Sequence, residues 1–488
     1  MSDKLAVIGG GLGGIAAALR ARAAGYNVSL FERLPNLGGR AQSLKLGPYR
    51  HDTGPTVITA PFLFDELFEL FGEKREDLVK FVELDPWYRF YFRDASIFDY
   101  GGNPEKIISE IKRYSPTDLA GYNRLLKHSK ALYKTAYEDL ADTPFHRLST
   151  LAKAIPTMLR LRADRSVWQL VGKYIKNQNL RRALSIQPLL LGGNPLDTTC
   201  IYSLIHYLER AHGVHFAMGG MGAVISALGE LMKRQNIKVV CNTSISRFKT
   251  IGNRVQSVVT EENQEIEANQ YIFNGDPLYL YRDLVDHSSL QVKFKMTYKR
   301  SMGLFVIFFG TSQKFDQIPH HSIWMGERFS GLLRDIFDHQ ILPKDFSLYI
   351  HRPTATDPSF APEGHDSFYV LAPVPNLRAQ INWKAQAPCL AEKIIDALND
   401  NEMPGLKSGI RNLKIMTPED FKEDYLSVDG AGFSIAPTFK QSAWFRFHNR
   451  SEDFKNLYFV GAGSHPGAGV PGVVSSAKVL ENIISNEA

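Results

Sequence analysis

The stretch LAVIGGGLGGIAAALRARAAGYNVSLFE, residues 5–32, decides the fold of this chain. An apolar run leads into Gly9-x-Gly11-x-x-Gly14, an alanine-rich helical segment follows, and a second apolar run ends at Glu32. This order of strand, glycine turn, helix and strand is typical of the dinucleotide-binding βαβ unit. Gly9 permits the turn, Gly11 lets the backbone approach a pyrophosphate, and Gly14 lets the helix pack on the strand. The helix N-terminus then faces phosphate, and Glu32 lies where a carboxylate binds a ribose diol.

Two glycine-containing segments after this unit favour FAD over a nicotinamide cofactor. GGR occupies residues 38–40, and DTGPT occupies residues 52–56. A nicotinamide dehydrogenase has no need of a second glycine pair here, whereas FAD is longer and extends along further backbone. Arg40 can place a fixed positive group beside phosphate. The alternative for residues 38–40 is a surface turn with a solvated arginine.

The segment NLYFVGAGSHPGAGVPGVVSSAKVLENII, residues 456–484, repeats the order of strand, glycine loop and helix. Residues 457–460 predict a short buried strand, and the helical spacing of apolar residues starts near Val473. The dipole of such a helix favours a ring that gains negative charge on reduction. The alternative, a glycine-rich linker, is disfavoured because a strand and an amphipathic helix flank the loop. We therefore expect the two ends of the chain to meet around one FAD.

A third fragment, residues 237–276, has short alternating runs joined by turn residues such as Gly252-Asn253. We expect these strands to complete the FAD-binding domain, with backbone near Ser244 and Ile245 in contact with the adenine.

These segments resemble those of the bacterial-type phytoene desaturases, which are FAD-dependent carotenoid desaturases of the flavin amine oxidase superfamily. The resemblance extends over nearly the whole chain. It rests on DTGPTVITAP (52–61), LLGGNP (190–195), IYSLIH (201–206), YRDL (281–284), APEG (361–364), YVLAPVP (369–375), QSAWFR (441–446) and GAGSHPGAGVPGV (461–473). The last stretch is the most specific, because other flavin amine oxidases have a different loop there.

The resemblance implies an α/β fold, in which a Rossmann-type FAD-binding domain joins a mixed-sheet substrate domain and an inserted helical, membrane-facing subdomain. The implied boundaries are 1–60, 217–280 and 450–488 for the FAD-binding domain, 61–110 and 281–449 for the substrate-binding domain, and 111–216 for the helical subdomain. With this resemblance, the candidate cofactor-binding residues are Gly9, Gly11, Gly14, Glu32, Arg33, Gly39, Arg40, Gly54, Pro55, Thr56, Val57, Ile245, Gly463, Val470, Pro471 and Gly472.

The implied reaction is desaturation of phytoene, a linear forty-carbon polyene, most often to lycopene. Hydride passes to the flavin, a proton leaves the neighbouring carbon, and oxygen or a membrane quinone reoxidises the FAD. Two alternatives stay open. One is a desaturase or isomerase that acts on another carotenoid, such as thirty-carbon diapophytoene or a hydroxylated or methoxylated carotene. The other is a non-catalytic escort protein for prenylated lipids, which the intact FAD motifs disfavour. An oligomer is compatible with either.

No catalytic residue can be assigned from the sequence, and no proton acceptor stands out. His465 lies in the C-terminal glycine loop, where a structural role is favoured. The pairs His320-His321 and His212-x-x-His215 lack a cysteine or carboxylate at ligand spacing, and adjacent residues on a strand point apart. We therefore predict packing or surface histidines and no metal site.

The net charge of +6 is concentrated in residues 151–182, which contain eight basic residues and one acid among apolar side chains. This pattern indicates basic amphipathic helices that can lie on an anionic membrane. A solvated helical face is the alternative, and nucleic acid is disfavoured because no nucleic-acid motif is present. Phytoene is insoluble and resides in the bilayer, so we expect the enzyme to dock there.

The remaining features of the sequence predict a cytoplasmic protein. The glycine motif begins almost at residue 1, which leaves no room for a signal or transit peptide ahead of it. No stretch approaches the ~18 uninterrupted apolar residues of a membrane span. The cysteines are far apart, which is typical of a reducing cytosol: Cys200, Cys241 and Cys389.

The middle of the chain predicts a helix and several buried strands. In residues 61–72 the apolar spacing is helical, and core packing is favoured over a membrane-facing or tunnel-lining position. Residues 304–309, 347–350 and 367–374 predict strands, several of them apolar on both faces and therefore buried. They predict a sheet that forms one wall of an apolar cavity against the flavin.

Overall fold

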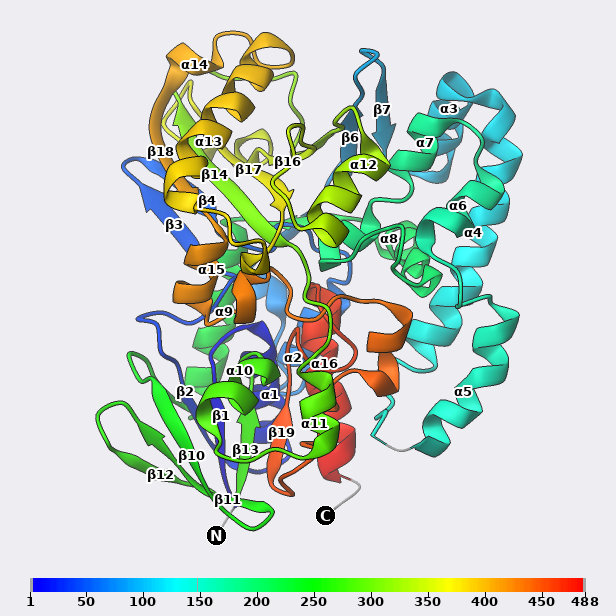
Figure 1. The fold of residues 1–488 in the computed structure, drawn as a ribbon. Helices are drawn as coiled ribbons and strands as arrows, with labels where there is room; N and C mark the ends of the chain where they lie inside the picture. The colour runs from blue at the N-terminus through cyan, green and yellow to red at the C-terminus, as the bar shows by residue number, and fades with distance from the viewer. Residues whose placement is uncertain (1–2, 147, 486–488) are drawn as a thin grey trace.

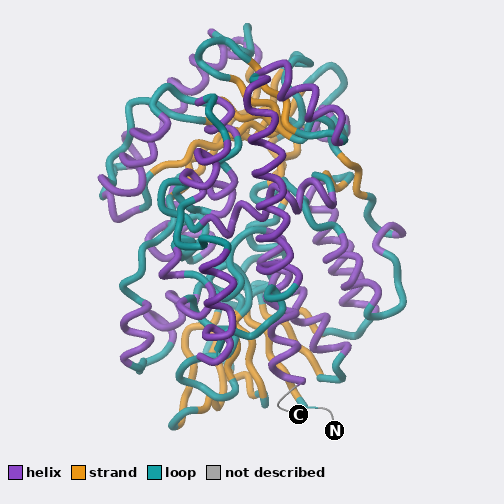
Figure 2. The backbone as a smooth tube through the Cα atoms, turned by 90° about the vertical axis from the view of Figure 1, so that its right-hand side faces the viewer, coloured by secondary structure: helices purple, strands orange, loops and turns teal. Residues whose placement is uncertain are grey.

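A computed structural model describes residues 3–146 and 148–485, and its fold is α/β with two large sheets (Figure 1). Figure 2 shows the strands gathered at the two ends of the molecule, with most of the helices between them. Among the described residues, no helix is both long and apolar enough to cross a membrane.

The lower sheet joins the beginning, the middle and the end of the chain. Its five strands have the order β19-β13-β1-β2-β9, and every neighbouring pair is parallel. The strands are β1 (Lys4–Ile8), β2 (Asn27–Phe31), β9 (Lys238–Val240), β13 (Gln270–Phe273) and β19 (Leu457–Phe459). The βαβ prediction and the predicted C-terminal strand are therefore confirmed.

Helices α1 (Leu12–Ala23), α9 (Gly220–Arg234) and α16 (Val470–Ser485) share one buried apolar cluster with β1 and β2. α16 begins at Val470, earlier than the predicted start near Val473. The reason is Pro471, because the first turn of a helix tolerates a residue without an N–H group.

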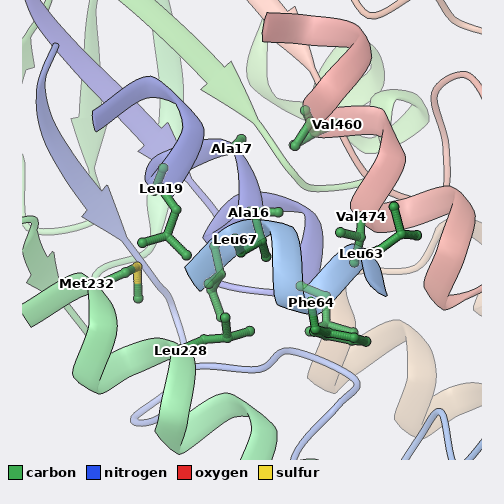
Figure 3. Close-up of a cluster of buried hydrophobic side chains, with 14 of the residues drawn as sticks. Ala16, Ala17, Leu19, Leu63, Phe64, Leu67, Leu228, Met232, Val460 and Val474 are labelled. Atoms are coloured by element: carbon green, nitrogen blue, oxygen red, sulfur yellow. The ribbon is translucent and has the colours of Figure 1, made fainter. Parts of the chain in front are cut away.

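The short helix α2 (Phe62–Glu69) completes this cluster. Leu63, Phe64, Leu67 and Phe68 are at most 3% exposed, and Figure 3 shows α2 side chains against those of α1, α9 and α16. The core-packing interpretation of residues 61–72 is confirmed. The membrane-facing or tunnel-lining alternative is wrong, because the apolar side of this helix covers the helices of the parallel sheet.

A small antiparallel sheet extends from the parallel one. It contains β10 (Ile245–Ile251), β11 (Arg254–Thr260) and β12 (Glu265–Glu267), with the predicted turn at Gly252-Asn253. The short strands predicted in residues 237–276 are therefore confirmed.

The upper sheet has seven strands in the order β18-β14-β17-β16-β15-β6-β7. All neighbours are antiparallel except β15 and β6. The strands are β6 (Tyr88–Tyr91), β7 (Ile97–Tyr100), β14 (Gly303–Thr311), β15 (His321–Trp324), β16 (Leu348–His351), β17 (Asp366–Val374) and β18 (Ile410–Met416).

Strand β14, which lies between β18 and β17, is buried along its whole length, as its apolar sequence predicts. Phe305, Ile307 and Phe309 point to one face, where they share a cluster with α13 (Trp383–Asp400). Leu304 belongs to the opposite face and lines the cavity described below. The hairpin of β3 (Ser43–Leu46) and β4 (Tyr49–Asp52) contacts this sheet.

A group of helices flanks the two sheets on one side of the molecule (Figure 1). They are α3 (Pro104–Tyr114), α4 (Leu119–Tyr133), α5 (Leu148–Arg160), α6 (Val167–Tyr174), α7 (Gln178–Ala183) and α8 (Leu204–His212). α6 begins with a capping box, in which Ser166 accepts from Gln169 N and the Gln169 side chain accepts from Ser166 N.

α2 lies within the predicted substrate-binding segment 61–110 but packs with the helices of the parallel sheet. The exact domain boundaries stay a prediction.

Replacing Phe64 by alanine should lower the free energy of unfolding by about 3–5 kcal/mol, because it leaves a cavity in the apolar cluster that α2 shares with α1, α9 and α16. Glu69→Ala on the same helix is the control, since that side chain is exposed. Urea titration followed by circular dichroism measures both variants. Equal urea midpoints for the two variants would show that the packing of α2 in the core does not stabilise the fold.

Candidate functional site

A cavity of about 620 Å³ is lined by residues from both sheets and from both ends of the chain. One part is formed by glycine loops that follow β1 and β19. The other part is lined by large aliphatic side chains, among them Leu189, Leu190, Leu191, Ile205, Leu208, Leu304, Leu332 and Leu371. The cavity thus combines a nucleotide-type loop region with an apolar wall.

The three glycines of the first motif have different surroundings. Gly9 has φ +100°, which favours glycine, and it makes the turn after β1. A Cβ atom on Gly14 would lie 2.0 Å from the carbonyl oxygen of Gly9, so α1 can pack this closely only with glycine there. Gly11 is extended and lines the cavity. Gly11 has no side chain that could cap α1, and the first turn of α1 contains no acidic residue. The N–H groups of this turn are therefore free to bind an anion.

Glu32 is buried at the edge of the cavity and is held by backbone. Its Oε2 accepts from Gly10 N at 2.6 Å, and its Oε1 accepts from Leu34 N at 2.8 Å. A carboxylate has about four acceptor positions, so this arrangement leaves capacity for a ribose diol. The neighbouring Arg33 also lines the cavity, and its guanidinium donates to the backbone oxygens of Glu423 and Asp424.

The second glycine pair lies directly against the first motif. Gly38 and Gly39 both have positive φ, and a Cβ atom on Gly39 would lie 3.3 Å from Gly11 Cα. Arg40 lines the cavity and donates to Ser427 Oγ at 2.5 Å. Burial lowers the pKa of its guanidinium, and the nearby Asp276 carboxyl counteracts that effect. Residues 38–40 are therefore part of the cavity, and the solvated-turn alternative is wrong.

The two ends of the chain meet at the side chain of Asn274, which follows β13. Its Nδ2 donates to the Gly9 carbonyl oxygen at 3.2 Å. A Cβ atom on Gly13 would lie 2.5 Å from Asn274 Oδ1 and 3.1 Å from Gly461 Cα. The expectation that both glycine loops converge is thus confirmed. Asn274 belongs to no predicted motif, although a polar residue at the carboxyl end of a parallel strand is a signal for a ligand contact.

Of the candidate cofactor-binding residues, all line this cavity except Gly14, which lies behind it in the contact of α1 with β1. Thr56 also bonds to the Tyr349 hydroxyl at 2.5 Å, which ties the segment 54–57 to the upper sheet. The first turn of α16, which contains Val470, Pro471 and Gly472, has no acid. Their contacts with a cofactor stay a prediction.

Other polar residues of the cavity were not found from the sequence. Asp276 lines it, accepts from Leu278 N and Ser434 Oγ at 3.0 Å each, and has its pKa raised by burial. Glu209 on α8 lines it as well. A single acid on an amphipathic helix carries no sequence signal, because most such residues are solvated. His465 lines the cavity too, and burial lowers its pKa to about 3, so it is neutral.

The histidine pairs differ from expectation in one respect. His320 and His321 do not point apart, since β15 begins only at His321, and their ring centroids are 4.6 Å apart. Together with His351 they form a buried group whose ligand nitrogens lie within 4.8 Å of one another. Burial keeps all three neutral, and the positive charge of Arg352 lowers the pKa of His320 further and opposes a cation. The absence of a metal stays a prediction.

These observations fit FAD. The uncapped N-terminus of α1 can bind its phosphates, glycine backbone allows its close approach, and Glu32 can accept from a ribose. The first turn of α16 lines the same cavity and contains no acid. The apolar wall continues from this region within the same cavity.

Comparisons with known proteins agree with this fit. Residues 12–479 match the family described as flavin containing amine oxidoreductase. The chain is 40% identical to a lycopene-forming phytoene desaturase of Pantoea ananas, over 98% of both chains. It is also 40% identical to a neurosporene-forming phytoene desaturase of Cereibacter sphaeroides, over 99% of this chain and 94% of that one. Wild-type putrescine oxidase shares the fold, with a TM-score of 0.67 and 14% identity over 100% of this chain and 99% of that one.

Gly11→Val should abolish flavin binding while the protein still folds, because the added side chain enters the cavity. Gly14→Ala should instead destabilise the fold, because its Cβ atom meets backbone. Visible flavin absorbance of the purified proteins and thermal unfolding of their FAD-free forms separate the two effects. A Gly11→Val protein that purifies yellow would contradict the assignment of this loop.

Proposed function

Because the chain belongs to the flavin containing amine oxidoreductase family, and within it to the bacterial phytoene desaturases, we propose that it desaturates phytoene to lycopene or a related carotene. The chain is an FAD-dependent oxidoreductase. The observation that carries the proposal is the single cavity in which glycine loops for FAD adjoin a long aliphatic wall.

The aliphatic wall suits a hydrocarbon substrate. Phytoene has no group that can form a hydrogen bond, so its recognition depends on apolar burial and on the shape of the cavity. FAD, when bound, supplies the acceptor for a hydride. The residues of this chain hold the polyene in place and exclude water from it. Leu189, Leu208 and Leu371, from three different elements, line the cavity for this purpose.

Other carotenoids are the alternative substrates. The 4,4'-diapolycopen-4-al dehydrogenase of Metabacillus indicus is 32% identical to this chain, compared with 40% for the phytoene desaturases. The higher identity favours the forty-carbon substrate. The intact cavity for FAD argues against a non-catalytic escort protein.

Purified protein with FAD and phytoene-containing liposomes should produce a coloured polyene with red-shifted absorption. Parallel reactions with oxygen, and with a quinone under anaerobic conditions, identify the electron acceptor. Chromatography of the products gives the number of double bonds formed. Unchanged phytoene beside conversion of a different carotene would overturn the substrate proposal.

We further propose that α5 docks on the membrane that holds the substrate. Ile155 and Leu159, one helical turn apart, are 45% and 64% exposed. Met158 on the same helix lines the cavity. α5 therefore stands between the cavity and the exterior, and its outer apolar side chains can enter a lipid surface.

The basic residues around α5 support electrostatic attraction to anionic lipid. Arg160, Arg162, Lys173 and Lys176 are exposed, whereas the side chain of Lys153 lies outside the described residues. Val167, Leu170 and Val171 of α6 are buried in the core. The interpretation as a solvated helical face therefore suits α6, and the docking proposal rests on α5.

The double variant Ile155→Ser, Leu159→Ser should bind anionic vesicles more weakly, since it removes the exposed apolar pair of α5. Ile251→Ser is the matched control, because this residue is 72% exposed on the β10 hairpin, away from α5 (Figure 1). Vesicle sedimentation at low and high salt measures binding. Replacing Arg160 and Arg162, the exposed basic residues at and just after the end of α5, by glutamine should weaken the salt dependence more than replacing Lys173 and Lys176, on and after α6. Equal sedimentation of all variants would overturn the docking proposal.

A further inference from the structure

The inner face of α8 brings one acidic side chain into the apolar part of the cavity. Leu204, Ile205, Leu208 and Glu209 line the cavity together, at the spacing of one helix face. Glu209 is completely buried, with 0% of the residue exposed. An acid at this position lies beside the surface that a hydrocarbon substrate would contact.

The Glu209 carboxyl is only half satisfied. Its Oε1 accepts from the Tyr88 hydroxyl at 3.0 Å, while its Oε2 is buried and has no hydrogen-bond partner. Burying an unpaired carboxylate oxygen costs free energy, and buried polar atoms in folded proteins are usually paired. The unpaired oxygen has no competing donor, and because its surface is closed in this conformation, it takes up a proton from a bound molecule when the side chain turns towards the cavity.

Glu209 also lies close to the predicted cofactor segment. Tyr88, its hydrogen-bond donor, stacks on His321 with ring centroids 5.8 Å apart, and His321 Nδ1 bonds to the Tyr349 hydroxyl at 2.8 Å. The hydroxyl of Tyr349 bonds to Thr56 at 2.5 Å, and Thr56 is a candidate FAD-binding residue. Tyr88, Glu209, Tyr349 and Thr56 all line the same cavity. The acid is thus only a few side chains away from the backbone expected to hold the cofactor.

We propose that Glu209 accepts the proton that leaves the substrate during desaturation, an inference that rests on the proposed function. Hydride leaves one carbon for the flavin, which is the oxidant. A C–H bond of the neighbouring carbon then breaks, and its electron pair becomes the new π bond. The proton forms an O–H bond with Oε2 of Glu209. The acid releases this proton before the next cycle.

The charge state of Glu209 suits this role. Burial raises its pKa to about 7, and the Tyr88 hydrogen bond and the charge of Arg210 partly offset that effect. Tyr100 on β7 and Tyr122 on α4 also face this carboxyl. A base that titrates near the working pH can both take up and release a proton.

Other buried groups are less suited. The pKa of Asp52 is also about 7, but Asp52 is not among the residues that line the cavity, and its Oδ1 accepts from Met221 N. Asp276 also lines the cavity and has an unpaired Oδ2, but its Oδ1 accepts from Leu278 N and Ser434 Oγ, and it follows β13 beside the glycine loops rather than along the aliphatic wall. His465 has a pKa of about 3, which makes it a weak base.

Glu209→Gln should lower kcat roughly 100- to 10,000-fold, with little change in carotene affinity measured by quenching of flavin fluorescence. Wild-type kcat should fall as the pH drops below about 7, because a protonated Glu209 accepts no proton. Tyr88→Phe should move this acid limb to higher pH, since it removes a hydrogen bond that stabilises the carboxylate. Glu209→Asp should retain part of the activity.

Infrared titration gives a readout that does not depend on turnover. A protonated-carboxyl C=O band should appear in the wild-type holoenzyme as the pH falls through about 7, and Glu209→Gln should lose that component. Asp52→Asn is the control, because it should lose a different component and keep the acid limb of kcat.

If the wild type is active and Glu209→Gln has a kcat within threefold of the wild-type value, the assignment of Glu209 alone is overturned. Loss of the acid limb in Asp52→Asn, with retention in Glu209→Gln, would overturn it too. A wild type that converts no carotene would instead refute the proposed function, and the role of Glu209 with it.

Discussion

The parallel pairing of β13 with β1 on one side and β19 on the other is the constraint on which the rest of the structure depends. Phe273 pairs with Ile8 and with Phe459, so three strands far apart in the sequence end at the same edge of one sheet. The loops that leave this edge must converge, and Asn274 contacts both glycine loops there. The cofactor site is therefore shared by the two ends of the chain, and glycines such as Gly13, Gly39 and Gly461 have close neighbours from another segment.

Much of this arrangement could be predicted from the sequence, because its parts have strong local signals. Gly9, Gly11 and Gly14 have a spacing that few other structures require, and β14 is recognisable from an apolar run on both faces. The rest depends on tertiary contacts that no local pattern records. Asn274 acquires a role only because β1 and β19 lie beside β13. Glu209 is distinguished by burial, which its helical periodicity alone does not reveal.

The two histidines at 320 and 321 illustrate the same limit. Alternation along a strand predicts that neighbouring side chains point to opposite faces. His320 precedes β15, which begins only at His321, so this alternation does not apply to the pair. α5 is a different case. Its amphipathic pattern is visible in the sequence, yet only the structure shows that Met158 lines the cavity while Ile155 and Leu159 are exposed. One side of α5 can therefore line the cavity while its other side contacts the membrane surface.

The position of β19 at the edge of the parallel sheet also has a consequence for biosynthesis. While a ribosome is still making the segment from β19 to α16, the nascent polypeptide can already pair β13 with β1, but β13 remains an open edge and half of the flavin cradle is missing. Flavin incorporation is then a late, post-translational event. Until it happens, the emerging chain displays an unpaired strand and uncovered aliphatic surface, which is the kind of exposure that chaperones recognise.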